Sequence, residues 1–226
     1  MNATKKIFAL IAILTITAGS VMAQGQGRRG RGFGNPYAVT TLINRDDVKE
    51  TLKLTDEQKA KLMDVLAQAQ TRRREAFQGL GITDFANITD EDRKRMTKVF
   101  TTVGIEITKN VLGALNPDQV KRIKEISIQH EGFGAAADTV FQDELGITED
   151  QKAKIDALTQ KMMTANFELF GKVRDGEMEQ GAMQDAMKKN QVTLTEEIGK
   201  ILTADQKAKI KDMSGTPFEI KDTNGR

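Results

Sequence analysis

Few residues in this 226-residue chain are of the kinds that carry out chemistry. The chain contains one histidine, His130, and no cysteine, so histidine-based triads, multi-histidine metal sites, thiolate ligands and cysteine nucleophiles cannot be assembled. No Gly-x-Ser-x-Gly, phosphate-loop or dinucleotide-binding motif occurs. The 32 Asp and Glu residues follow helix-start patterns and charged faces, where solvated charge is the usual role. We therefore expect a protein that is not an enzyme and that uses no cofactor.

Methionine is the remaining residue type with chemistry of its own. Five of the ten methionines crowd the second half of the chain, at Met162, Met163, Met178, Met183 and Met187. The simplest interpretation is that they fill an apolar seam between helices. Flexible thioethers also suit a surface that accepts varied apolar partners. Thioethers ligate Cu(I) as well, but without cysteine or further histidine we expect no defined metal site.

A short motif, Leu/Ile-Thr-x-x-Gln or a close variant, occurs four times and indicates where helices begin. Thr or Asn at its second position is a good N-cap, and the Gln three residues later completes a capping box. Acidic residues and one proline fill the first turn, which suits the positive end of the helix dipole. The expected capping pairs are Thr55 with Gln58, Asn116 with Gln119, Thr148 with Gln151, and Thr203 with Gln206. Helix capping alone accounts for most of this pattern without any activity.

The four motifs form two pairs, which indicates a tandem duplication. The first opening motif, at Leu54, is repeated 93 residues later at Ile147. The first closing motif, at Leu115, is repeated 87 residues later at Leu202. Flanking segments align at similar shifts, so the repeating unit is about 85–95 residues long. Each unit is predicted to be a helical hairpin with short helices at its ends.

Apolar residues between the motifs recur in steps of three and four, which is typical of amphipathic helices or a coiled-coil seam. The stripe positions are Leu62, Leu66, Ala69, Ala76 and Leu80; Met96, Phe100, Val103, Ile107 and Val111; Ile155, Leu158, Met162, Ala165 and Leu169; and Met183, Met187, Leu194, Ile198 and Ile201. Arg73 and Gln191 interrupt them, and no segment alternates like a strand. The predicted fold is all-α, with two tandem hairpin units of long antiparallel helices, elongated or cradle-like. The units are expected at 37–130 and 131–215, followed by a tail at 216–226.

The N-terminal segment has the pattern of a secretory signal peptide. Lys5 and Lys6 precede an apolar run, and a small-residue site predicts cleavage after Ala23. An uncleaved anchor is the alternative, but the run is shorter than the roughly 20 apolar residues that span a bilayer. Removing residues 1–23 leaves 34 − 2 = 32 basic and 32 acidic residues, a net charge of zero. We expect a periplasmic or secreted protein with a flexible Gly/Arg-rich segment at 24–36, and no role in nucleic-acid binding.

The signal-peptide pattern, the lack of cysteine and the paired Leu-Thr-x-x-Gln motifs resemble the Spy/CpxP-like family of periplasmic stress proteins. The matching stretches are 52–66, 114–126, 145–158 and 201–213, about a quarter of the exported chain. The resemblance implies an ATP-independent chaperone or an envelope-stress modulator, with antiparallel helices forming a curved cradle, usually as a dimer. This chain differs from the family pattern because it carries two such units, and because it lacks the histidine-rich tails of the zinc-associated branch.

The leading hypothesis is therefore an exported chaperone that shields apolar segments of unfolded or misfolded proteins. The alternatives are a regulatory partner of an envelope stress sensor and a metal-responsive binding protein. We expect a pseudo-dimeric monomer, or else a homodimer, with the units joined at 129–138, where Gly132 and Gly134 permit a turn. The candidate client-binding residues are Phe77, Phe100, Met162, Met163, Phe167 and Phe170. A competing account buries the same side chains in the hairpin seams.

Overall fold

A computed structural model describes residues 38–82 and 88–220. The expected signal peptide at 1–23 and the Gly/Arg-rich segment at 24–36 lie outside the described residues. Across the described ranges the chain forms helices and no strand, so the predicted all-α class is confirmed. The elements are α2 (Ala38–Leu42), α3 (Asp46–Thr51), α4 (Asp56–Gly79), α5 (Asp90–Leu112), α6 (Pro117–Glu131), the 3₁₀ helix η2 (Gly132–Ala137), α7 (Thr139–Leu145), α8 (Glu149–Arg174), α9 (Gln180–Ile201) and α10 (Ala204–Met213).

The order of elements repeats, as the duplicated sequence predicts. Helix α3 begins at Asp46 and α7 at Thr139, while α4 begins at Asp56 and α8 at Glu149, so both pairs differ by 93 residues. Helix α6 begins at Pro117 and α10 at Ala204, a difference of 87. The two halves therefore contain the same succession of short, long, long and short helices.

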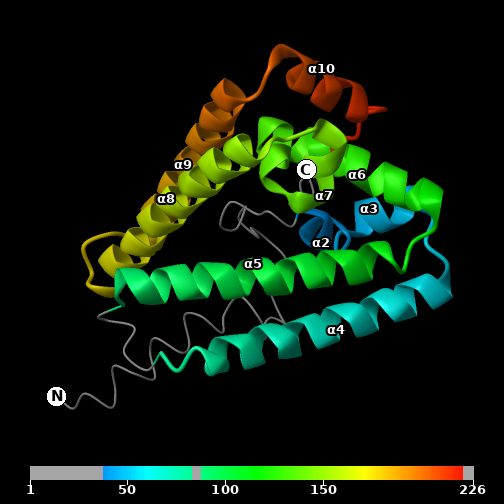
Figure 1. The fold of residues 1–226 in the computed structure, drawn as a ribbon. Helices are drawn as coiled ribbons and strands as arrows, with labels where there is room; N and C mark the ends of the chain where they lie inside the picture. The colour runs from blue at the N-terminus through cyan, green and yellow to red at the C-terminus, as the bar shows by residue number, and fades with distance from the viewer. Residues whose placement is uncertain (1–37, 83–87, 221–226) are drawn as a thin grey trace.

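Each half contains a hairpin of two long antiparallel helices. Helix α4 packs along α5, and α8 packs along α9. The two hairpins are inclined to each other, with α6, η2 and α7 gathered at one end of the molecule (Figure 1). At the other end the tip of the α8–α9 hairpin lies beside the beginning of α5, and α5 contacts α8. Within a single chain, the hairpins are thus linked through α2, α6 and η2 at one end and touch directly at the other.

The buried side chains form two hydrophobic cores, and the chain passes from the first to the second near the predicted boundary of the units. The first core runs from Ala38 to Ile126 and the second from Ile128 to Ile210. The expected boundary at residues 130 and 131 falls close to this change of core. The C-terminal segment is an exception, because Phe218 and Ile220 pack back against the first core.

The apolar stripes form the seams of the hairpins. Every stripe position predicted from the sequence is buried or half-buried, and Ile155 and Ile198 are completely buried. Burial of one such side chain contributes about 1.5–3 kcal/mol, so the seam is the main source of hairpin stability. Of the two interrupting residues, Arg73 is exposed and Gln191 is half-buried.

The turn between the units contains Gly132 and Gly134, the two glycines at which the sequence predicts a turn. Gly132 ends α6 with a φ of +55°, a conformation that side chains with a Cβ rarely adopt. Gly134 is buried, and a Cβ added there would lie 3.3 Å from Thr195 Oγ1 of α9. The first glycine therefore permits the change of direction, and the second permits η2 to approach the second hairpin.

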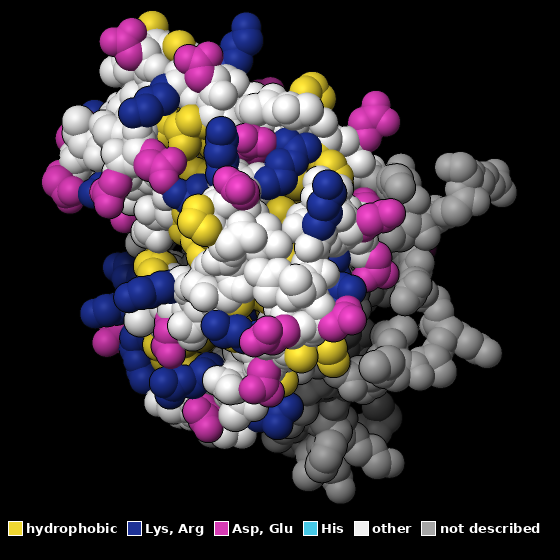
Figure 2. Space-filling view, turned by 90° about the vertical axis from the view of Figure 1, so that its right-hand side faces the viewer, with side chains coloured by type: hydrophobic (Ala, Val, Ile, Leu, Met, Phe, Trp, Pro, Cys, Tyr) yellow, Lys and Arg dark blue, Asp and Glu magenta, His cyan; other side chains and the backbone are white. Residues whose placement is uncertain are grey.

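The surface mixes charges of both signs. On the face shown in Figure 2, Lys and Arg side chains alternate with Asp and Glu, with small apolar areas between them. The large hydrophobic side chains that are clearly exposed among the described residues are Met63, Ile105 and Val192. None of the described helices combines the length and the apolar character needed to cross a membrane.

Candidate functional site

The repeated motifs form capping boxes and, in addition, bind each other in pairs. In the second unit, Thr148 Oγ1 accepts a hydrogen bond from Gln151 N at 3.2 Å, and Gln151 Oε1 accepts from Thr148 N at 3.0 Å. Thr203 and Gln206 repeat this box at the start of α10. All four motifs have both bonds of the box, and an unpredicted fifth box joins Thr89 to Asp92 at the start of α5.

The two capping glutamines of the second unit face each other. Gln151 Nε2 donates to Gln206 Oε1 at 2.8 Å, and Gln206 Nε2 donates back to Gln151 Oε1 at 2.9 Å. Each amide also donates to a main-chain carbonyl beside the other motif, Gln151 to Ile201 O at 3.1 Å and Gln206 to Gly146 O at 3.0 Å. Both side chains are buried, at 8% exposure. We call this pair the second glutamine clasp.

The first unit contains the same arrangement, which we call the first glutamine clasp. Gln58 Nε2 donates to Gln119 Oε1 at 2.6 Å, and Gln119 Nε2 donates to Gln58 Oε1 at 3.0 Å. Gln119 Nε2 also reaches Leu52 O at 3.0 Å, whereas the bond from Gln58 to Ala114 O is longer, at 3.4 Å. The glutamine of the motif thus closes a helix start and joins the opening motif of a unit to its closing motif.

The clasps explain why glutamine is needed at this position. A carboxylate at the third helical residue would complete a capping box equally well, as Asp92 does. Only an amide, however, has both a donor and an acceptor for a reciprocal bond to an identical side chain. The motif is therefore chiefly a structural device that holds the open end of each hairpin.

Five of the six candidate client-binding residues are half-buried, and they lie on α4, α5 and α8. Met163 on α8 is half-buried, and its Sδ lies 3.8 Å from Thr97 Oγ1 on α5. Phe167 follows Met163 by one helical turn and is half-buried on the same face. Phe100 follows Thr97 by three residues, and its ring centroid lies 6.3 Å from that of Phe77 on α4. Phe170, also half-buried, continues the face of α8 toward the hairpin tip.

One of the six candidates is wrong. Met162 is 6% exposed and belongs to the second core, so it does not line a surface. Its position follows from helical spacing, because Met162 lies seven residues after the completely buried Ile155 and shares its seam. We call the five remaining residues, Phe77, Phe100, Met163, Phe167 and Phe170, the crossing surface.

Buried polar residues between α8 and α9 were not found from the sequence. Asn166 is 1% exposed, and its Oδ1 accepts a hydrogen bond of 2.8 Å from Asn190 Nδ2. Such a bond fixes the alignment of the two helices, because sliding either helix would leave the buried Asn166 amide without its partner. The sequence carried little signal for this bond, because the two asparagines are 24 residues apart and meet only once the hairpin has closed.

Asp138 is the most perturbed acid among the described residues. It is 4% exposed at the start of α7, where its Oδ1 accepts a hydrogen bond from Val140 N at 3.0 Å. Its Oδ2 is buried without a hydrogen-bond partner. Burial raises the pKa of this carboxyl to about 7, against the opposing effects of the Val140 amide and the Lys124 charge. Lys124 itself is paired with Glu144.

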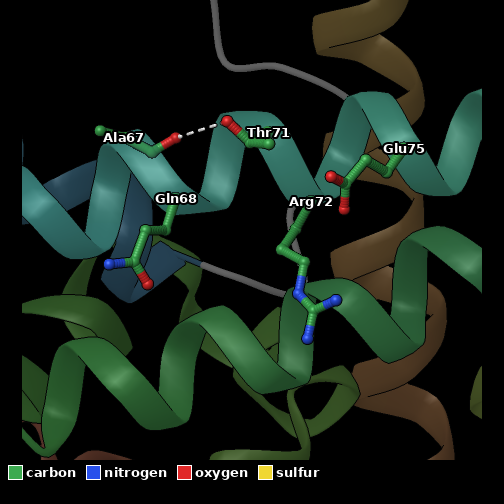
Figure 3. Close-up of a pocket in the computed structure, with 5 residues that line it drawn as sticks. All are labelled: Ala67, Gln68, Thr71, Arg72 and Glu75. Carbon is green, nitrogen blue, oxygen red and sulfur yellow. Dashed lines mark hydrogen bonds between the residues drawn. The ribbon is translucent and has the colours of Figure 1, made fainter.

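Two hollows are open to solvent and neither has the form of an enclosed ligand site. The first, of about 500 Å³, lies along α4, and its lining residues are all exposed (Figure 3). Arg72 extends from it toward α5, where its Nη2 lies 3.4 Å from Glu106 Oε1. The second, of about 670 Å³, lies over the second glutamine clasp, beside Lys154 and Lys200. Within the described residues no group of three or more His, Cys, Asp or Glu side chains is placed to hold a metal ion.

Comparison with protein-family models, characterised proteins and solved structures gave no match for this chain. The resemblance to the Spy/CpxP-like family therefore rests on the motifs themselves.

Proposed function

We propose that this protein is an exported, ATP-independent chaperone of the Spy/CpxP-like kind that binds apolar segments of unfolded proteins. The observation that carries the proposal is the crossing surface, whose half-buried Met and Phe side chains lie on both hairpins, with Met163 of α8 in contact with Thr97 of α5. Methionine has three rotatable bonds and a polarisable sulfur, so such a surface adapts to different apolar side chains. The surrounding mixed charges keep the free protein soluble and give a client polar contacts around the apolar ones.

We further propose that one chain is the working unit. The contact between Thr97 of α5 and Met163 of α8 joins the two units within a single chain. A protein with one unit would need two copies to form such a surface. In this chain both units are present in one molecule. Light scattering should give the mass of one chain at micromolar concentration, and a tight dimer would contradict the proposal.

An aggregation assay tests the binding function. The chain should suppress aggregation of a chemically unfolded client at equimolar ratio, and replacing Met163 and Phe167 with Ser should weaken this protection at least several-fold. The matched control is Met63→Ser, because Met63 is 73% exposed on the other hairpin and lies outside the crossing surface.

Thermal melts must accompany the assay. Because Met163 and Phe167 are half-buried, the double variant should keep a cooperative transition with a modest decrease in Tm. Collapse of the melting transition would mean that these residues are core, and equal protection by the variant and the wild-type chain would show that clients bind elsewhere.

A further inference from the structure

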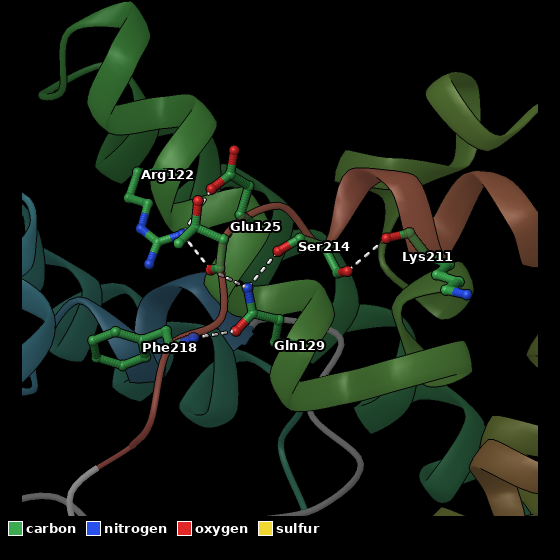
Figure 4. A network of polar contacts seen from close by, with 7 residues as sticks. Arg122, Glu125, Gln129, Lys211, Ser214 and Phe218 are labelled. Carbon is green, nitrogen blue, oxygen red and sulfur yellow. Dashed lines mark hydrogen bonds and ion pairs between the residues drawn. The ribbon is translucent and has the colours of Figure 1, made fainter.

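The C-terminal segment is held by side chains of α6 that form hydrogen bonds with its main chain. Gln129 of α6 donates from Nε2 to Ser214 O and, at 2.8 Å, to Thr216 O, while its Oε1 accepts from Phe218 N at 2.7 Å (Figure 4). Arg122, two turns earlier on α6, donates to Thr216 O at 2.7 Å. One amide therefore binds the carbonyl of residue 216 and the N–H of residue 218, as a neighbouring β-strand would.

The side chains of this segment alternate between the protein and solvent. Phe218 and Ile220 are half-buried and pack against the first core, whereas Pro217 and Glu219 are exposed. This two-residue period is that of an extended chain lying on a surface. The Arg122 guanidinium lies 5.9 Å from the centre of the Phe218 ring, close enough for a cation–π contact, and is also paired with Glu125 at 2.8 Å.

The contacts divide into two kinds. The hydrogen bonds made by Gln129 and Arg122 are to main-chain atoms at 214, 216 and 218, which every peptide possesses. The contacts made by the first core select residue types, an aromatic at 218 and an aliphatic at 220. Main-chain hydrogen bonds that give affinity, combined with pockets for alternate side chains that give selectivity, are the mark of extended-peptide recognition.

We propose that the face of α6 carrying Arg122 and Gln129, with the adjoining first core, is a binding site for extended peptides of the pattern aromatic-x-aliphatic. The chain's own tail at 214–220 occupies the site in the free protein, and a matching client segment replaces it. This inference rests on the proposed function, since it names a class of client segment and a second site for it. Gly215, with a φ of +58°, places the tail at the site's entrance, where a Cβ would lie 2.3 Å from Glu125 Cδ.

The tail limits access because it is tethered. A tethered segment has an effective concentration in the mM range, so a free peptide at micromolar concentration competes poorly with it. Weakening the tail's own anchors should therefore expose the site without changing the residues that form it.

Fluorescence anisotropy with a labelled peptide of the sequence of residues 214–220 tests the proposal in the full chain. The Phe218→Ser, Ile220→Ser double variant should bind the peptide at least tenfold more tightly than the wild-type chain does. Adding Gln129→Met should reduce that binding at least fivefold, and a peptide with Ser in place of its Phe and Ile should not bind. Circular dichroism melts check that each variant stays folded.

The outcomes are distinguishable from those of the aggregation assay. Failure of the double variant to bind the peptide, or equally tight binding by the wild-type chain, would overturn the tail-site proposal even if clients are protected. Peptide binding that depends on Gln129, in a chain that protects no client, would support the site while overturning the chaperone function. A tail that seats on a second copy instead would appear as a dimer in light scattering and would contradict occupancy within one chain.

Discussion

Replacing Gln151 with Met should destabilise the second unit by about 2–4 kcal/mol. Methionine keeps the length and helix preference of glutamine but removes its amide. The substitution eliminates the bond from Thr148 N, the bond to Ile201 O and both bonds exchanged with Gln206. In a site that is 8% exposed, the side chain of Gln206 then keeps only its bonds with Thr203 N and Gly146 O.

The magnitude follows from these losses. A typical hydrogen bond contributes about 1 kcal/mol net, and a buried polar group left unsatisfied costs about 1–3 kcal/mol. The four lost bonds set the cost of the substitution. Rehydration of polar groups at the edge of the clasp and burial of the apolar methionine side chain offset part of it, which gives the expected loss of about 2–4 kcal/mol. For a chain of this size, 1 kcal/mol lowers Tm by about 2–4 °C, so Tm should fall by roughly 4–16 °C.

Urea and thermal melts followed by circular dichroism measure the effect. The matched control is Gln160→Met, which makes the same substitution at an exposed position of the same helix. In a double-mutant cycle, Gln151→Met and Gln206→Met together should cost clearly less than the sum of the two single variants, because they share the reciprocal bonds. A change for Gln151→Met no larger than that for Gln160→Met, or strict additivity, would refute the clasp.

Three further predictions concern other parts of the chain. Thr148→Ala should cost about 1 kcal/mol by removing the capping acceptor of α8, and an unchanged urea midpoint would contradict this role. Asp138 has an ordinary pKa of 3.8 unfolded and about 7 folded, so its folded state holds the proton more tightly and the free energy of unfolding should fall as pH rises from about 4 to 7. The free energy of unfolding should decrease by at most about 4 kcal/mol over this range. Asp138→Asn should remove most of this pH dependence, and an equally steep pH profile in the variant would exclude Asp138 as its source. N-terminal sequencing of the exported protein should begin at Gln24, and an intact Met1 would contradict cleavage.

The helix starts were predictable because their hydrogen bonds are local. A threonine and a glutamine three residues apart contain all the atoms of the capping box, so the start of α8 at Glu149 follows from the sequence. The clasp is different, because Gln151 and Gln206 are 55 residues apart and meet only once the hairpin has closed. The sequence repeats therefore indicated the position of each glutamine but not the bond between them.

The residues of the two proposed binding surfaces were harder to predict, for two physical reasons. Helical spacing placed Met162 in the seam with Ile155, whereas its neighbour Met163 is half-buried against the same core and also contacts Thr97 of α5. The crossing surface therefore borders directly on the second core, and a wide apolar stripe does not show where one ends and the other begins. The contacts of Gln129 with the tail span 85–89 residues, and a lone glutamine in an amphipathic helix carries no signal for them.

Site-specific photo-crosslinking tests the central claim most directly. A benzophenone side chain placed at Phe167, on the crossing surface, should crosslink to an unfolded client and not to the same client after it has folded. The same group at Val192, which is 51% exposed on α9, should crosslink weakly if at all. Stronger crosslinking at Val192 than at Phe167, by a chain that still suppresses aggregation, would contradict the assignment of client binding to the crossing surface.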